Sequence, residues 1–181
     1  PYTSIAEKFG VEFDFHPFFK MEPLTSREFR AQRINILDHT AIVFSARTTI
    51  DAFFQLCEEL RVKVPETMKY FCTTEAVANY LQKHIVYRKR KIFHEPTFAE
   101  LVGTMKKHKE EKFFLPSSNL VTEDHDGMLS EAKLDYTKAV IFRTVSSDLS
   151  HIDITKYDML VFFSPAGIDS LKANFPDFVQ N

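Results

Sequence analysis

Glycine is scarce in this sequence and tryptophan is absent: the 181 residues include four glycines and no tryptophan. The loops that cradle phosphates and the turns that bind dinucleotides need closely spaced glycines, because the backbone must approach the ligand without an intervening side chain. Four scattered glycines cannot form such a loop anywhere in the chain. We therefore expect no nucleotide cofactor.

Cysteine is also scarce. The two cysteines, Cys57 and Cys72, do not have the spacing of a zinc finger, and the seven histidines show no metal-ligand spacing. We expect no metal site and two ordinary thiols in a reducing compartment. A Ser-His-Asp or Cys-His catalytic arrangement does not follow from the spacing either.

Long apolar runs and an excess of one charge are missing as well. No uninterrupted apolar stretch approaches the roughly 20 residues that span a bilayer, and the first residues carry no charged and then apolar leader. The 23 Lys and Arg residues are balanced by 25 Asp and Glu residues. Such a chain has no general attraction for nucleic acid or for an anionic membrane. We expect a cytoplasmic protein with neither partner, in which any anion-binding site is local.

Apolar residues are plentiful, at 44% of the chain, and can build a packed interior. Short apolar runs such as 41–44 are followed by apolar residues at helical spacing, and this unit recurs along the chain. Parallel strands need a crossover, which a helix supplies, so the pattern predicts an α/β fold with a parallel sheet. Residues 11–19 and 158–164 are also predicted to be strands, and Gly10 is predicted to end a helix.

One phrase occurs twice in the chain. "VFSARTTIDAF" at residues 43–53 and "VFFSPAGIDSL" at residues 161–171 align without a gap on Ile-Asp. Both place small or polar residues where a strand turns into a helix. In parallel sheets, ligands bind at the carboxyl ends of strands, where helix amides point outward. The repeat therefore indicates an anion site built from turns.

Four turns have this character, and together they predict a site that grips carboxylates or phosphates through backbone amides. They are Ser45-Ala46-Arg47, Thr73-Thr74-Glu75, Pro116-Ser117-Ser118-Asn119, and Ser164-Pro165-Ala166-Gly167. A plainer interpretation stays open, since Ser and Thr are preferred at helix starts in any protein as caps for the first amides.

The ordered set "VFSARTTIDAF", "YFCTTEAVANYL", "FFLPSSN", "AVIFRTV" and "VFFSPAGIDSL" resembles the uroporphyrinogen-III synthase family over nearly the whole chain. The resemblance implies two doubly wound parallel-sheet α/β domains joined by a two-stranded linker, with the second domain inserted into the first. Domain one would comprise residues 1–19 and 140–181, and domain two residues 20–139. The repeated phrase would then occur once per domain, facing a shared cleft.

The resemblance also implies the chemistry. A lyase of this family cyclises hydroxymethylbilane, a linear tetrapyrrole, with inversion of the terminal pyrrole ring and loss of water, and it uses neither cofactor nor metal. The substrate-facing positions would be the four turns named above together with Phe142 and Arg143. We expect a monomer, and a chain truncated at both ends relative to the family.

Two departures from the family bear on catalysis. Each copy of the repeated phrase has lost one hydroxyl residue. Phe142 occupies the position of a tyrosine thought to help the substrate hydroxyl leave, and a phenyl ring cannot donate that proton, so the catalytic donor is unknown. A noncatalytic two-lobed binding module for a polyanionic small molecule is therefore the alternative to the enzyme. An α/β scaffold whose capped turns bind nothing is a third hypothesis.

Overall fold

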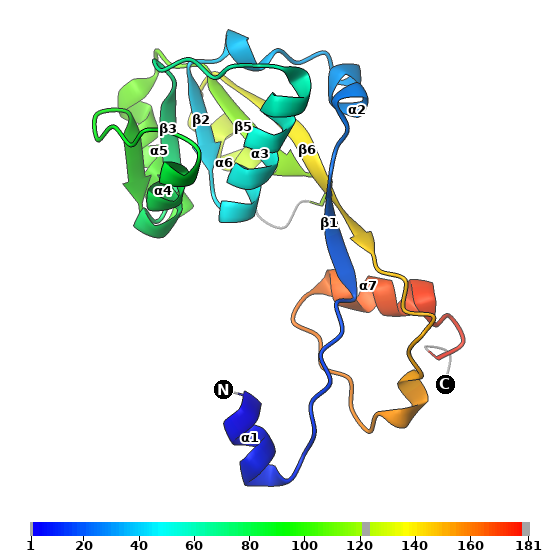
Figure 1. Ribbon diagram of the computed structural model, residues 1–181. Helices are drawn as coiled ribbons and strands as arrows, with labels where there is room; N and C mark the ends of the chain where they lie inside the picture. Colours follow the sequence, from blue (N-terminus) through cyan, green and yellow to red (C-terminus); the bar gives the residue numbers. More distant parts are fainter. Residues whose placement is uncertain (1, 121–123, 179–181) are drawn as a thin grey trace. The chain divides into compact units, whose positions relative to one another are not determined.

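The computed structural model describes residues 2–120 and 124–178 (Figure 1). Contacts within the chain divide it into two compact units. One consists of Pro1–Met21 with Thr144–Asn181, and the other of Glu22–Arg143.

The larger unit is built on a parallel sheet. β2 pairs in parallel with β3 on one side and with β5 on the other, β3 continues to β4, and β5 continues to β6. The order in the six-stranded sheet is β1-β6-β5-β2-β3-β4. The strands are β1 (Phe19–Pro23), β2 (Ala41–Phe44), β3 (Lys69–Thr73), β4 (Ile92–Glu95), β5 (Phe113–Ser118) and β6 (Tyr136–Ser146). The predicted α/β fold with a parallel sheet is confirmed for β2 to β6, while β1, which begins in the smaller unit, completes the sheet beside β6.

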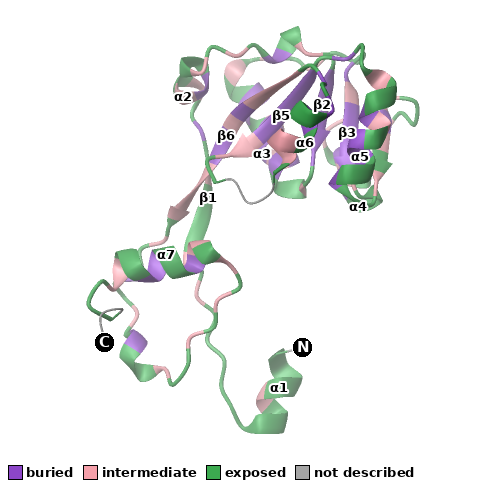
Figure 2. Cartoon of the chain, turned by 180° about the vertical axis from the view of Figure 1, so that it is seen from behind, coloured by how far each residue is buried: buried purple, intermediate pink, exposed green. Residues whose placement is uncertain are grey.

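Helices cover both faces of this sheet. Buried residues of α2, α3 and α4 form one apolar cluster with the strands, and buried residues of α5 and α6 form a second cluster. The helices are α2 (Ser26–Ala31), α3 (Arg47–Leu60), α4 (Glu75–Tyr80), α5 (Phe98–Met105) and α6 (His125–Glu131), with 3-10 turns at Ile36–Asp38, Leu81–Lys83 and Lys106–His108. Figure 2 shows the buried residues concentrated on the strands between these layers.

The continuous apolar run of β2 follows from this layering. Ile42 and Phe44 belong to the cluster under α3, while Ala41 and Val43 belong to the cluster under α5. Successive side chains of a strand point to opposite faces, so a strand covered on both faces needs apolar residues at every position. All four residues are buried.

Because glycine is scarce, residues with side chains adopt the left-handed backbone conformation after several helices. Arg33, Arg61 and Lys133 follow α2, α3 and α6 with φ between 54° and 56°, positions where many helices carry glycine. Gly10 has φ +63 and follows α1 (Tyr2–Phe9), as predicted. Helix starts are conventional by comparison: Thr25 with Glu28, and Thr97 with Glu100, form reciprocal capping boxes.

The smaller unit contains α1, a 3-10 turn at Ile154–Lys156 and α7 (Pro165–Asn174). Leu149, Ile154 and Leu171 are its buried apolar residues. The strands predicted for residues 11–19 and 158–164 are wrong, because of these residues only Phe19 lies in a strand, as the first residue of β1. A strand is stable only when a neighbour takes up its N–H and C=O groups. The described residues of this unit form no sheet of their own, so the predicted second doubly wound sheet is not found in them.

Candidate functional site

The strand order reverses between β2 and β5, whose carboxyl ends lie at the same edge of the sheet. From β2 the chain moves outward to β3 and β4, then returns to the other side of β2 as β5 and continues to β6. Such a reversal of strand order is where open α/β sheets bind ligands, because the two loops leave in opposite directions. Three of the four predicted turns lie at this edge, following β2, following β3 and at the end of β5.

The turn after β2 starts the 14-residue helix α3. Ser45 and Arg47 are exposed and Ala46 is half-buried. Ala46 is the N-cap residue, and no side chain caps the helix. The expectation that Ser45 acts as a cap is therefore wrong. The first amides of a helix have no acceptor within it and carry partial positive charge, so this helix start has the chemistry of an anion site.

Arg47 extends this positive end. Its guanidinium carbon lies 5.6 Å from the centre of the Tyr80 ring, a distance at which a cation is attracted to the ring face. No carboxylate among residues 2–120 and 124–178 forms an ion pair with Arg47. Its charge is thus available to an anionic ligand.

A polar network that the sequence did not predict fixes Tyr80. The Tyr80 hydroxyl donates to Asp51 at 2.7 Å, and Lys83 and His84 also contact that carboxylate, at 3.2 and 2.8 Å. Burial by itself raises the pKa of Asp51, but these hydrogen bonds lower it by more. The network ties α3 to the end of α4. Asp51 lies about 30 residues before its three partners, so no local spacing in the sequence could have revealed the network.

The turn after β3 combines a buried hydroxyl with an unusual backbone. The Thr73 Oγ1 atom is buried and has no hydrogen-bond partner. Thr74 has φ 73 and ψ 147, a region that is almost exclusive to glycine and costs a β-branched residue about 1–3 kcal/mol. Its hydroxyl accepts from the Val77 amide at 3.4 Å. Thr74 is therefore a cap, as the plainer interpretation predicts, while Thr73 has no such explanation. Glu75, exposed, opens α4.

Replacing Thr74 by glycine tests the strain. Glycine relieves about 2 kcal/mol of backbone strain, and the lost cap and greater unfolded-state freedom together cost about 1 kcal/mol. We expect Thr74→Gly to be more stable by about 1 kcal/mol in chemical unfolding. The control is Thr97→Gly, since Thr97 caps α5 with an unstrained φ of −127. That variant should lose stability, and a loss in both would contradict the strain.

The third predicted turn is a strand. Pro116, Ser117 and Ser118 belong to β5, and only Asn119 follows it, so the predicted polar turn was wrong. The cause is β6, which extends far enough to pair with these residues. The Ser117 hydroxyl donates to the Ala139 carbonyl at 3.1 Å and the Ser118 hydroxyl to the Leu120 carbonyl at 2.7 Å. A register shift between Ser117 and Ser118 is of the kind found beside active sites.

Phe142 and Arg143 lie on β6, beside this shift. Phe142 is only 8% exposed and belongs to the apolar cluster under α3, and its carbonyl accepts from the Asn119 amide at 3.3 Å. Arg143 donates to Glu28 at 2.6 Å and lies 3.8 Å from Glu22. Its charge is thus already balanced by two carboxylates, unlike that of Arg47. This pairing was not visible in the sequence.

The pair gives a pH-dependent prediction. Hydrogen bonds from the backbone and side chain of Thr25, followed by that of Arg143, lower the pKa of Glu28 to about 2. A carboxyl with a lowered folded-state pKa contributes stability above its unfolded pKa, and loses it as the pH falls through the folded value. We expect Arg143→Gln to raise the Glu28 pKa only partly toward 4.5, measured by carboxyl NMR. A fully normal pKa would show that Thr25 has no part in it.

The fourth turn belongs to the smaller unit. Ser164 is the N-cap residue of α7 and Pro165 follows it, but no side chain caps this helix, so the expected cap is absent here too. Ala166 is half-buried, and Gly167 is buried. A Cβ at Gly167 would lie 2.9 Å from Phe162. Glycine therefore has a packing role at this position, and larger replacements should lower stability.

Other chemistry is limited in the part of the chain that the structure describes. Burial raises the pKa of both Cys57 and Cys72 to about 12, so these free thiols are not nucleophiles at neutral pH. His108, Glu110 and Glu111 place possible metal ligands within 4.8 Å of one another, but Glu111 is already paired with Lys69. Within the described residues, no helix has the length and apolar character needed to cross a membrane.

Comparisons with known proteins identify similar chains. A family model described as uroporphyrinogen-III synthase HemD matches residues 1–180. The crystal structure of uroporphyrinogen-III synthetase from Helicobacter pylori is 16% identical with a TM-score of 0.52, and the match covers 87% of this chain and 68% of that one. A mutant uroporphyrinogen III synthase from the extremely thermophilic bacterium Thermus thermophilus is 12% identical with a TM-score of 0.58, covering 81% and 58%. Curated proteins gave no match.

Proposed function

The chain belongs to the uroporphyrinogen-III synthase HemD family, and we propose that it closes hydroxymethylbilane into the tetrapyrrole macrocycle, with inversion of the terminal ring and loss of water. The family is one of cyclising lyases that act without a cofactor, and membership supports this function in haem biosynthesis. The chain spans 68% and 58% of the two solved structures. The cyclisation is therefore a proposal for this chain, and the assay below tests it.

The observation that carries the proposed site is the strand reversal between β2 and β5. The uncapped start of α3, with Arg47, lies at the end of β2. The substrate bears acetate and propionate groups, which suit helix amides and an unpaired guanidinium. Holding these groups would bring the two ends of the linear chain together, and this positioning supplies much of the rate enhancement of a cyclisation.

We also propose the family's arrangement of two domains, residues 1–19 with 140–181 and residues 20–139. The two contact units, divided near residues 21 and 144, support this division. The start of α7, like that of α3, has no side-chain cap, so its amides have the same chemistry toward an anion.

The test is the isomer composition of the product. The chain is incubated with hydroxymethylbilane, the product is oxidised, and type III porphyrin is separated from type I. Enrichment of type III above spontaneous closure supports the enzyme. Binding of the substrate without enrichment favours the noncatalytic binding module, for which Phe142 is the specific observation. If the chain does not bind hydroxymethylbilane, the remaining hypothesis is an α/β scaffold whose capped turns bind nothing.

Phe142→Tyr tests the family's tyrosine position. We expect turnover at or above that of the parent, because the added hydroxyl can donate a proton and Phe142 keeps 8% exposure. The measurement is the initial rate of type III formation, with the free energy of unfolding measured in parallel.

Phe44→Tyr is the matched control for that variant. Phe44 is fully buried, so its added hydroxyl has no route to solvent and should lower stability by about 1–3 kcal/mol. A large loss of turnover in a stably folded Phe142→Tyr variant would contradict the alignment of Phe142 with the family's tyrosine.

A further inference from the structure

A pocket lies at the other end of the sheet from the candidate site. Its residues come from the segment before β3 and the segment before β4, at the amino ends of these parallel strands. The turns at Ser45 and Thr73 lie at the carboxyl ends. The pocket is therefore separate from the proposed tetrapyrrole site, and it lies wholly within the larger unit.

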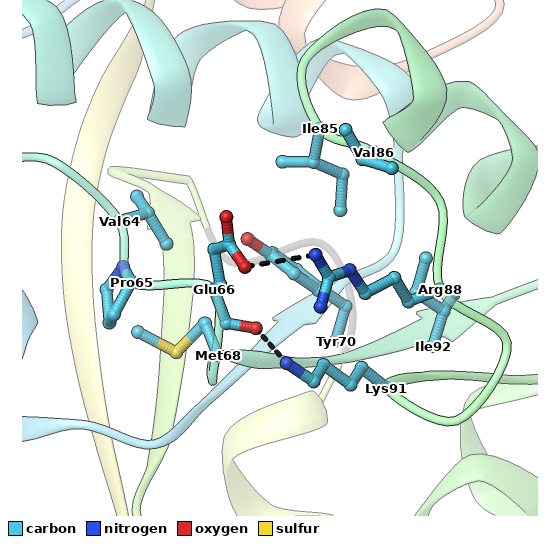
Figure 3. Close-up of a pocket in the computed structure, with 10 residues that line it drawn as sticks. All are labelled: Val64, Pro65, Glu66, Met68, Tyr70, Ile85, Val86, Arg88, Lys91 and Ile92. Atoms are coloured by element: carbon cyan, nitrogen blue, oxygen red, sulfur yellow. Dashed lines mark hydrogen bonds and ion pairs between the residues drawn. The ribbon is translucent and has the colours of Figure 1, made fainter.

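The walls of this pocket are apolar, and its rim is charged (Figure 3). Tyr70 and Ile92 enter from β3 and β4, while Arg88 and Lys91 extend from the loop before β4 toward Glu66. The apolar residues are Val64, Pro65, Met68, Ile85, Val86 and Ile92. The cavity has a volume of ≈ 190 Å³. A cavity of about 150 Å³ holds a benzene molecule, so this one suits a ring with a short side chain.

The charges at the rim do not balance. Arg88 and Lys91 provide two cations, and Glu66 provides one carboxylate among the lining residues. Arg88 donates to the Glu66 carboxylate at 3.0 Å, whereas Lys91 donates to the Glu66 backbone carbonyl. The side chains of the Arg88–Glu66 pair are 52% and 80% exposed, and such pairs contribute little stability. A second carboxylate can therefore compete for Arg88.

Val86 and Tyr70 each offer a group that a bound ligand would contact. Val86 is 79% exposed at the rim, where an apolar ligand would cover it. Tyr70 is 4% exposed, and its hydroxyl forms no hydrogen bond with another described residue. Burial raises its pKa, so it remains a hydrogen-bond donor at neutral pH.

We propose that this pocket binds a small monocarboxylate with an apolar body the size of one aromatic ring, its ring against Met68, Tyr70 and Ile92 and its carboxylate on Arg88 and Lys91. Apolar walls give affinity for the ring, and the net positive rim selects the anion. This is a ligand class and a site distinct from those of the proposed cyclisation. The basic stretch 88–91 thereby acquires a role in binding an anion.

The probe is 3-phenylpropionate, titrated into the isotope-labelled chain and followed by amide NMR. We expect saturable shifts confined to residues 64–70 and 85–92, with a dissociation constant of about 1 mM for a ligand this small. The neutral counterpart 3-phenylpropan-1-ol should bind at least about fivefold more weakly, since it lacks the charge. Equal binding of the alcohol, or shifts scattered over the surface, would overturn the proposal.

Two exposed substitutions should act in opposite directions. Arg88→Gln removes a cation and should weaken binding about fivefold, whereas Glu66→Gln removes the competing carboxylate and should tighten binding about threefold. Arg90→Gln, which removes an equal charge from a residue outside the pocket lining, should leave binding unchanged. Failure of Glu66→Gln to tighten binding would refute the role of the rim. No substrate is used, so the outcome is independent of the isomer assay.

Discussion

Lys69→Met is expected to lower the free energy of unfolding by about 3 kcal/mol at neutral pH, near the lower end of what breaking a buried ion pair costs. The Lys69 ammonium pairs with Glu111, and their side chains are 30% and 9% exposed. Methionine has a similar length but no charge, so Glu111 would remain buried without its cation. The partial exposure of Lys69 is the reason for expecting the lower end of the range.

The stability that this variant loses should depend on pH. Burial by itself raises the pKa of Glu111, but hydrogen bonds from Lys69 and Thr40 lower it by more. In the parent, this stability is present above the unfolded pKa and is lost as the pH falls through the folded one. In Lys69→Met, the hydrogen bond and the charge of Lys69 are lost while the burial remains, so the folded pKa of Glu111 rises above that of the parent. The free energy of unfolding that Lys69→Met loses relative to the parent should therefore be greatest at neutral pH and become smaller as the Glu111 carboxyl is protonated.

The double variant Lys69→Met with Glu111→Gln is the control, because it leaves no buried charge. It should recover at least about 1 kcal/mol of the loss. Denaturant unfolding monitored by circular dichroism at several pH values measures all three chains. A single variant that is less stable by the same amount at every pH would show that packing, not the charge of Glu111, is responsible.

Arg47→Gln is expected to lower kcat/KM for hydroxymethylbilane about 10- to 100-fold, since a hydrogen bond to a charged group contributes about 1.5–3 kcal/mol. Arg47 begins α3 beside the strand reversal, and among the described residues no carboxylate neutralises it. The loss should appear mainly in KM if Arg47 holds a carboxylate equally in the ground state and the transition state. Initial rates of type III formation at several substrate concentrations measure it.

Arg30→Gln provides the matched control. Arg30 is exposed on α2 and loses the same charge, so its variant reports any general electrostatic effect. It should retain the kcat/KM of the parent within about twofold. An Arg47→Gln variant within the same margin would remove Arg47 from the proposed site, whereas the type III enrichment of the parent would still test the activity itself.

The recurring strand-then-helix pattern was sufficient to predict the parallel sheet of the larger unit. Ile42 and Phe44 face one apolar cluster and Ala41 and Val43 the other, so the uninterrupted run 41–44 encodes a strand covered on both faces. The capping box of Thr25 with Glu28 was also readable, because both partners lie within one helical turn.

The candidate site was predictable only in part. The sequence correctly places the turns after β2 and β3, since a strand followed by a helix fixes where each turn falls. It could not show that Thr74 caps its helix while Ala46, at the corresponding position of α3, does not. It also could not show that Arg143 is paired and Arg47 is not, because the partner carboxylates depend on tertiary packing.

The sequence by itself determined the alternation of strands and helices in the larger unit, the two-sided burial of its central strands and the absence of a glycine-rich phosphate loop, since each follows from local composition and spacing. Tertiary structure alone decided that β6 extends β5 through Ser118, that residues 11–18 and 158–164 are not strands, and which charges remain unpaired. The physical reason is that strand pairing and ion pairing each need a partner from elsewhere in the chain. A local sequence pattern specifies one partner of such a pair and not the other.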